Sequence, residues 1–155
     1  GQGFLVYVFD DTDYDGTSDL PTIISITGTE NSGNATISSV PANGWVLAGN
    51  PYSSTIDWDL VSDDNSPFGS TAYVWDDATS SYKSWNGSGS LTGGLIAPYQ
   101  AFWVQNTFAP NQTLTISESH KASRSGILYR DLELKESGSV SLDISSNIFQ
   151  YKVFI

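Results

Sequence analysis

The chain has 155 residues, no cysteine and a formal net charge of −11, with only six Lys and Arg residues. The length suits one ordinary domain, and the lack of cysteine excludes disulfides, zinc–thiolate sites and thiol catalysis. Because so acidic a surface repels phosphate groups, we expect no nucleic-acid partner. No stretch of about 18 apolar residues occurs, so the sequence predicts no membrane span.

Short runs of alternating apolar and polar residues, separated by turn residues, recur along the chain. Between residues 118 and 125 we expect one short helical turn at most. The pattern predicts an all-β fold, an antiparallel β-sandwich of jelly-roll-like type. The expected strands lie near residues 3–10, 22–29, 34–40, 45–50, 54–58, 71–76, 81–85, 93–97, 100–107, 112–118, 126–134, 139–144 and 148–155.

Four apolar residues of the expected strands are predicted to lie in the core. Each occupies an apolar position of a strand bounded by turns, where a side chain is normally buried. They are Trp45, Phe102, Val104 and Ile116.

An acidic loop follows the first expected strand, Phe4–Phe9. Asp11, Asp13, Asp15 and Asp19 occupy positions 1, 3, 5 and 9 of this loop, and Gly16 occupies position 6. This spacing is typical of Ca²⁺ loops, which supply oxygen ligands from one tight turn. Position 12 is Thr22 instead of the glutamate of an EF-hand, so the loop resembles the calcium loops of dockerins or thrombospondin type-3 repeats. The alternative is a solvated acidic turn, which the same residues would also form.

A weak internal repeat suggests two degenerate halves. Residues 2–6 (Gln-Gly-Phe-Leu-Val) align with residues 100–104 (Gln-Ala-Phe-Trp-Val), and residues 22–26 match residues 113–117 in character. We therefore expect a single domain in which residues 1–43 form an incomplete first copy. Residues 44–120 would form the second copy, and residues 121–155 would add C-terminal strands.

The second copy resembles a known family. The segment Gly44–Tyr52 reads GWVLAGNPY and is followed by Ile-Asp-Trp at 56–58, and residues 96–104 read IAPYQAFWV. These motifs are similar to a β-module of Bacteroidota-type secreted surface proteins, which are large chains exported by the type IX system. The resemblance implies an extracellular or cell-surface location and neighbouring domains in a larger secreted chain. It implies no catalytic residue.

Aromatic residues gather in one expected hairpin. Tyr73 and Trp75 lie on its first strand, and Tyr82 and Trp85 lie on its second. Their rings are expected to pair across the strands and so stabilise the sheet. Alternatively, the four residues form a platform on which sugar rings stack, as in a carbohydrate-binding module, and Trp75 and Trp85 would then share one exposed face.

Residues suited to catalysis are few. His120 is the only histidine, lies in a polar segment and is expected at the surface. No nucleophile motif surrounds any serine, and no pair of carboxylates is marked out as in a glycosidase. The sequence therefore favours a non-enzyme, a structural or adhesive module. A carbohydrate-binding module is the alternative, and a hydrolase with dispersed carboxylates is the third hypothesis.

The C-terminal run suggests self-assembly. Phe149, Tyr151, Val153 and Ile155 fall on one face of the last expected strand. Within one subunit this strand would complete the sandwich. If the incomplete first copy leaves an open sheet edge, a strand from a second copy of the chain would fill it and build a filament.

Overall fold

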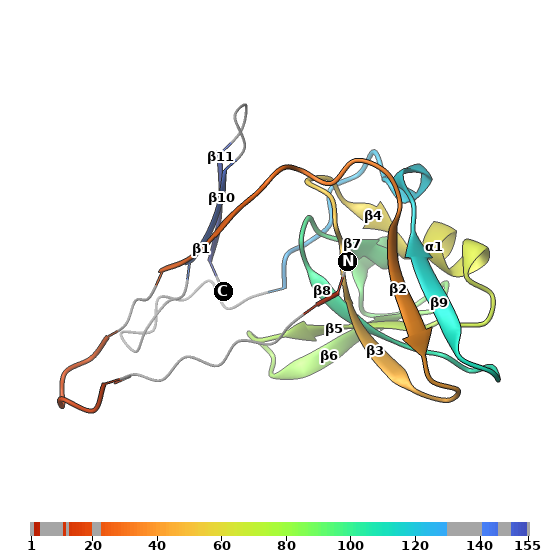
Figure 1. The fold of residues 1–155 in the computed structure, drawn as a ribbon, viewed down its shortest axis with the longest axis horizontal. Helices are drawn as coiled ribbons and strands as arrows, with labels where there is room; N and C mark the ends of the chain where they lie inside the picture. The colour runs from red at the N-terminus through yellow and green to blue at the C-terminus, as the bar shows by residue number, and fades with distance from the viewer. Residues whose placement is uncertain are drawn as a thin grey trace. The chain divides into compact units, whose positions relative to one another are not determined.

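The fold is known from a computed structural model, which describes residues 2–3, 11, 13–19, 23–129, 141–145 and 150–154 (Figure 1). Two compact units make up the chain. The first comprises Gly1–Phe4 and Asn31–Tyr129, and the second comprises Leu5–Glu30 and Arg130–Ile155. These bounds do not coincide with the repeat boundaries expected near residues 43 and 120.

The first unit is built on a four-stranded antiparallel sheet. Its strand order is β3 (Trp45–Gly49), β8 (Ala101–Gln105), β5 (Ala72–Asp76) and β6 (Ser81–Trp85). Two antiparallel pairs accompany this sheet, β2 (Ala35–Val40) with β9 (Gln112–Ile116), and β4 (Ile56–Asp57) with β7 (Leu95–Ile96). The expected all-β, sandwich-like fold is thus confirmed.

The core lies between the inner face of the four-stranded sheet and the remaining elements of this unit. Phe102 and Val104 of β8 and Ile116 of β9 are buried there, as the sequence predicted. Trp58 packs its ring against Phe102 in an edge-to-face contact, with centroids 5.5 Å apart. The indole N–H of Trp58 donates to the Ser70 carbonyl at 2.7 Å. The polar atom of the buried Trp58 side chain is therefore hydrogen-bonded.

The prediction that Trp45 is buried was wrong. Half of its surface is exposed, whereas Ala48 on the same strand is fully buried. Successive side chains of a strand point to opposite faces, so Trp45 shares the outer face with Leu47, and the inner face belongs to Val46 and Ala48. Both faces of β3 are apolar, and the residue pattern therefore could not distinguish them.

A short helix, α1 (Trp58–Asp64), was missed by the sequence reasoning, which expected a strand over 54–58. The Asp57 carboxylate caps the helix by accepting the backbone N–H of Asp59 at 3.0 Å. Trp58 and Val61, spaced by one turn, are buried beneath it. Two turns are too short to display a helical period in the sequence.

Two 3-10 turns also occur in the first unit, η1 (Thr92–Gly94) and η2 (Glu118–His120). The second confirms the single turn expected between residues 118 and 125. Residues 126–129 are not a strand, in contrast to the prediction of one over 126–134, whose remaining residues lie outside the described part of the chain.

The second unit contains a three-stranded sheet in the order β1 (Ile23–Thr27), β10 (Ser141–Ser145) and β11 (Gln150–Phe154). The C-terminal strand β11 pairs in antiparallel fashion with β10 of the same chain. β1 pairs with β10 in parallel, which differs from the antiparallel arrangement expected. The expected strand Phe4–Phe9, Thr22, Phe149 and Ile155 lie outside the described residues. In the part of the chain that the structure describes, no helix is both long and apolar enough to cross a membrane.

Candidate functional site

One row of side chains crosses the outer face of the four-stranded sheet. Leu47 of β3 lies opposite Trp103 of β8, and Trp103 lies opposite Tyr73 of β5. Tyr73 in turn lies opposite Ser84 of β6. The neighbours Ala48, Val74 and Phe102 are buried on the inner face, so this row points away from the core.

Aromatic rings dominate this outer face. Trp75 and Tyr82 are cross-strand partners whose rings meet edge to face, with centroids 5.0 Å apart and planes at 73°. Trp45 and Tyr73 form a second edge-to-face pair at 5.6 Å and 62°. Trp45, Trp75 and Tyr82 are 50%, 45% and 51% exposed. We call Trp45, Tyr73, Trp75, Tyr82 and Trp103 the aromatic face.

The expected ring pairing across the hairpin is confirmed for Trp75 and Tyr82, but Trp85 does not share their face. Trp85 lies opposite Ala72, which is fully buried, so it belongs to the inner side of the sheet. Its ring packs against the core, and its N–H donates to the Asp59 carboxylate at 2.8 Å. A Cβ atom on Gly94 would come within 2.6 Å of the Trp85 indole nitrogen, so the ring is seated closely over that glycine.

The platform predicted from the sequence therefore has a different composition. Tyr73, Trp75 and Tyr82 belong to the aromatic face, Trp85 does not, and Trp45 and Trp103 take its place. From the sequence, Trp45 was expected in the core, and no function was predicted for Trp103. One signal was present: if Phe102 and Val104 are core residues, the alternation of β8 places Trp103 on the opposite face.

The outer face of the sheet carries no charged side chain, and all of its strand positions are described. Asp76 and Lys83 are the charged residues of these strands, and both lie on the inner side, joined by an ion pair of 3.1 Å. A hydrogen bond from the Thr79 hydroxyl, together with Lys83, lowers the pKa of Asp76. The outward positions are Trp45, Leu47, Gly49, Tyr73, Trp75, Tyr82, Ser84, Ala101, Trp103 and Gln105.

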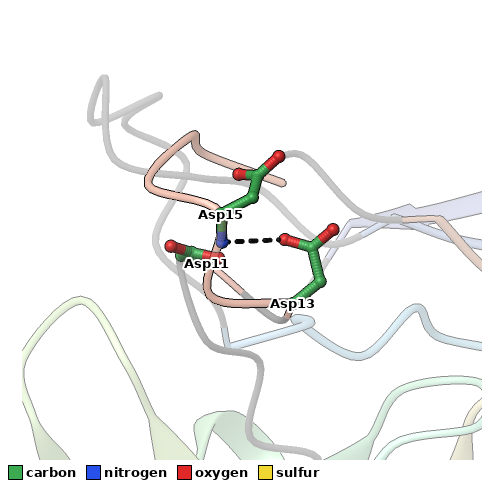
Figure 2. Close-up of side chains that lie close together, drawn as sticks. All are labelled: Asp11, Asp13 and Asp15. Atoms are coloured by element: carbon green, nitrogen blue, oxygen red, sulfur yellow. Dashed lines mark hydrogen bonds between the residues drawn. The ribbon is translucent and has the colours of Figure 1, made fainter.

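A second candidate site is the acidic loop of the other unit. One carboxylate oxygen from each of Asp11, Asp13 and Asp15 lies within 4.8 Å of the other two (Figure 2). Backbone N–H groups hold the loop in shape: Gly16 donates to Asp11 Oδ2 at 2.8 Å, and Asp15 donates to Asp13 Oδ1 at 3.2 Å. Gly16 has a φ of +86°, which supplies the sharp turn expected at position 6.

Hydrogen bonds within the loop favour the charged form of one of its carboxylates, Asp15. The hydroxyl and backbone N–H of Thr17 both donate to Asp15 Oδ1, and these bonds lower the pKa of Asp15. Asp11 Oδ1 is a buried atom without a hydrogen-bond partner. The structure thus brings together three of the four predicted ligands, and Asp19 lies outside the cluster. Such hard oxygen donors suit a cation such as Ca²⁺, which takes about six to eight of them.

His120 is buried, in contrast to the predicted surface position. Its Nδ1 accepts the backbone N–H of Ser117 at 3.0 Å, so the ring proton resides on Nε2. Nε2 then donates to the Asp64 carboxylate at 2.9 Å. With both ring nitrogens engaged in hydrogen bonds, His120 joins the end of α1 to η2.

The chain matches no protein-family model, no curated protein and no solved structure. Its function is therefore inferred from the geometry and chemistry of these two sites.

Proposed function

We propose that this chain is a non-catalytic extracellular module that adheres to carbohydrate through the aromatic face. The observation that carries the proposal is the grouping of five aromatic residues on one uncharged sheet face, three of them about half exposed. Exposed apolar groups of this kind commonly mark binding surfaces. Indole and phenol rings offer flat apolar surfaces on which the C–H faces of sugar rings pack, and the phenol hydroxyls add hydrogen bonds.

An ordinary wet sheet face would look different. Antiparallel sheets with one solvated side usually alternate apolar inward and polar outward residues. In β5 the inward residues Ala72 and Val74 are apolar as expected, but the outward residues Tyr73 and Trp75 are aromatic instead of small and polar. The cross-strand pair of Trp75 with Tyr82 also stabilises the sheet, by about 0.2–1 kcal/mol. This stabilisation involves only the two paired rings, so it does not explain why Trp103 also lies on the outer face.

The extracellular part of the proposal draws on the resemblance of roughly residues 44–120, together with the leading strand, to secreted surface modules. Polysaccharides are abundant outside cells, and other domains of a larger secreted chain would supply catalysis or anchoring. In this proposal the module contributes adhesion. The strongly acidic composition favours solubility in that setting.

The test is retention on polysaccharides, followed by titration of the intrinsic tryptophan fluorescence with soluble glycans. Trp45→Ala and Trp75→Ala are each expected to weaken binding about tenfold, which is the effect of losing one central contact. Phe108→Ala is the matched control, because Phe108 is an exposed aromatic residue in the loop after β8 and outside the aromatic face. Undiminished retention of the Trp45→Ala/Trp75→Ala double variant would contradict the proposal.

A second proposal concerns Ca²⁺ at the acidic loop. It is favoured by one specific observation, the buried and unpartnered Asp11 Oδ1 beside two further carboxylates. A cation held by Asp11, Asp13 and Asp15 would supply the missing partner and offset the mutual repulsion of the three charges. The remaining ligands would come from backbone carbonyls or water, since Asp19 lies outside the cluster.

Self-assembly into filaments stays a prediction. The strand that would be donated, β11, is paired with β10 of the same chain, which corresponds to the alternative in which it completes the fold of one subunit. Carbohydrate adhesion is supported by the aromatic face, whose residues the structure describes, and we therefore prefer it to strand exchange as the function.

A further inference from the structure

We propose that the ligand of the aromatic face is the extended chain of a neutral polysaccharide, and that polysaccharides bearing carboxylate or sulfate groups bind much more weakly. The inference rests on the proposed carbohydrate-binding function and specifies its ligand class. Two independent features of the site support it, the distribution of charge and the number of strands that the aromatic face crosses.

The charge distribution disfavours an anionic glycan. None of the outward positions on β3, β8, β5 and β6 is charged, so a bound carboxylate or sulfate would meet no cation there. Lys83 is the cation of these strands, and it lies on the inner side with its ammonium group 3.1 Å from Asp76. An anionic chain would also be repelled by a protein whose formal net charge is −11.

The other cations of the first unit do not supply the missing charge. Lys121 stacks over the Tyr52 ring at 4.5 Å and lies 3.6 Å from Glu118. Arg124 lies 3.7 Å from Asp57, at the capped start of α1. In the described residues 31–129, every Lys and Arg thus has a carboxylate partner, and none of these ion pairs lies on the outer face of the sheet.

Neutral hydrogen-bonding groups occur where sugar hydroxyls would lie. Ser84 ends the row that crosses the sheet, and Gln105 lies opposite Trp45. The Gln105 amide N–H donates to the Asn43 carbonyl at 3.0 Å, and the amide oxygen is a further acceptor. Together with the phenol groups of Tyr73 and Tyr82, these groups match uncharged donors and acceptors.

The width of the face favours a chain over a single sugar. The row from Leu47 to Ser84 crosses four strands, and three inter-strand spacings amount to about 14 Å. Two ring pairs lie along this span, Trp45 with Tyr73 and Trp75 with Tyr82. Several consecutive sugar units would therefore stack, and affinity should rise with chain length through the added contacts.

The decisive experiment uses two soluble glucans with the same backbone, neutral hydroxyethyl cellulose and anionic carboxymethyl cellulose, titrated against the full chain at 50 and 500 mM salt. Hydroxyethyl cellulose is expected to bind, with an affinity that changes less than about twofold between the two salt concentrations, since no charge pair contributes. Carboxymethyl cellulose should bind at least about tenfold more weakly at low salt. In a series of neutral oligosaccharides, the monosaccharide should not bind, and affinity should increase with length.

Tighter binding of carboxymethyl cellulose, or a preference for monosaccharides, would overturn this inference and leave the proposed adhesion to carbohydrate intact. If no polysaccharide of either class bound, or if the only partner of the aromatic face were a protein, the proposed function itself would fail. Loss of hydroxyethyl cellulose binding in Trp75→Ala, with retention in Phe108→Ala, would support both the proposed adhesion to carbohydrate and the inference that the ligand is neutral.

Discussion

Asn65 and Thr115 exchange hydrogen bonds as two paired strand residues would. The Thr115 backbone N–H donates to Asn65 Oδ1 at 2.8 Å, and the Asn65 side-chain amide donates to the Thr115 carbonyl at 2.8 Å. The same amide also donates to the Val61 carbonyl at 2.7 Å. Asn65 is buried at the end of α1, so one side chain fastens the helix to the edge of β9.

Replacing Asn65 with Ala is therefore expected to lower the free energy of unfolding by about 1–3 kcal/mol, because buried backbone groups lose their partners. Urea denaturation followed by tryptophan fluorescence measures the change. Asn31→Ala is the control, since the Asn31 amide bonds only to the Gly33 carbonyl at an exposed site. Equal stability of the two variants would show that the Asn65 contacts contribute nothing to the fold.

Phe102 tests the placement of the core. Its side chain is fully buried beneath the sheet and contacts Trp58, so Phe102→Ala should cost about 3–5 kcal/mol. Phe108→Ala removes an equally large but exposed ring and should change stability by less than about 0.5 kcal/mol. A loss below about 1 kcal/mol for Phe102→Ala would contradict its position in the core.

Calcium removal tests the acidic loop. If Asp11, Asp13 and Asp15 bind Ca²⁺, the metal stabilises the native state by mass action, and chelation with EDTA should lower the melting temperature. Asp13→Ala and Asp15→Ala should each abolish this response to EDTA. Asp77→Ala, at an exposed turn outside the loop, should retain it. An identical melting curve with and without excess EDTA would exclude a stabilising metal in the loop.

Asp76 should make stability depend on acid pH. Because the Thr79 hydroxyl and Lys83 lower the pKa of Asp76 in the folded state, its contribution is present above the ordinary carboxyl pKa of about 4. It is lost as the pH falls from there through the lowered folded-state pKa. The difference in unfolding free energy between wild type and Asp76→Asn should therefore be constant from pH 5 to 8 and shrink below about pH 4. Asp77→Asn is the control for removing one negative charge, and a constant difference at acid pH would refute the prediction.

Strand exchange is tested by truncation after Asn147, which removes β11. If this strand is donated between copies, the shortened chain should stay folded and lose only its self-association, measured by analytical ultracentrifugation. If β11 completes the sheet of its own chain through its pairing with β10, the second unit should lose stability instead. A wild-type chain that is monomeric at high concentration would end the filament hypothesis.

Much of the fold was predictable because its signals are local. Alternation of side chains and the turn residues between runs identified the hairpin of β5 and β6 and the expectation that aromatic rings pair across it, which Trp75 and Tyr82 do. The acidic loop was recognised from the spacing of its aspartates around Gly16. These features depend on residues close together in the chain, where spacing alone fixes which side chains meet.

Which face of each strand is buried follows from long-range packing. In β3 both faces are apolar, and the packing of Ala48 against the core left Trp45 outside. Trp85 was drawn inward because it lies opposite the buried Ala72 and its indole bonds to Asp59, a residue of α1. The parallel pairing of β1 with β10 likewise joins segments more than a hundred residues apart. The residue pattern was enough to predict that aromatic strands form a sheet. Which rings stay exposed was set by the burial of one sheet face against elements distant in the chain. Burial depends on these neighbours, and no local pattern specifies them.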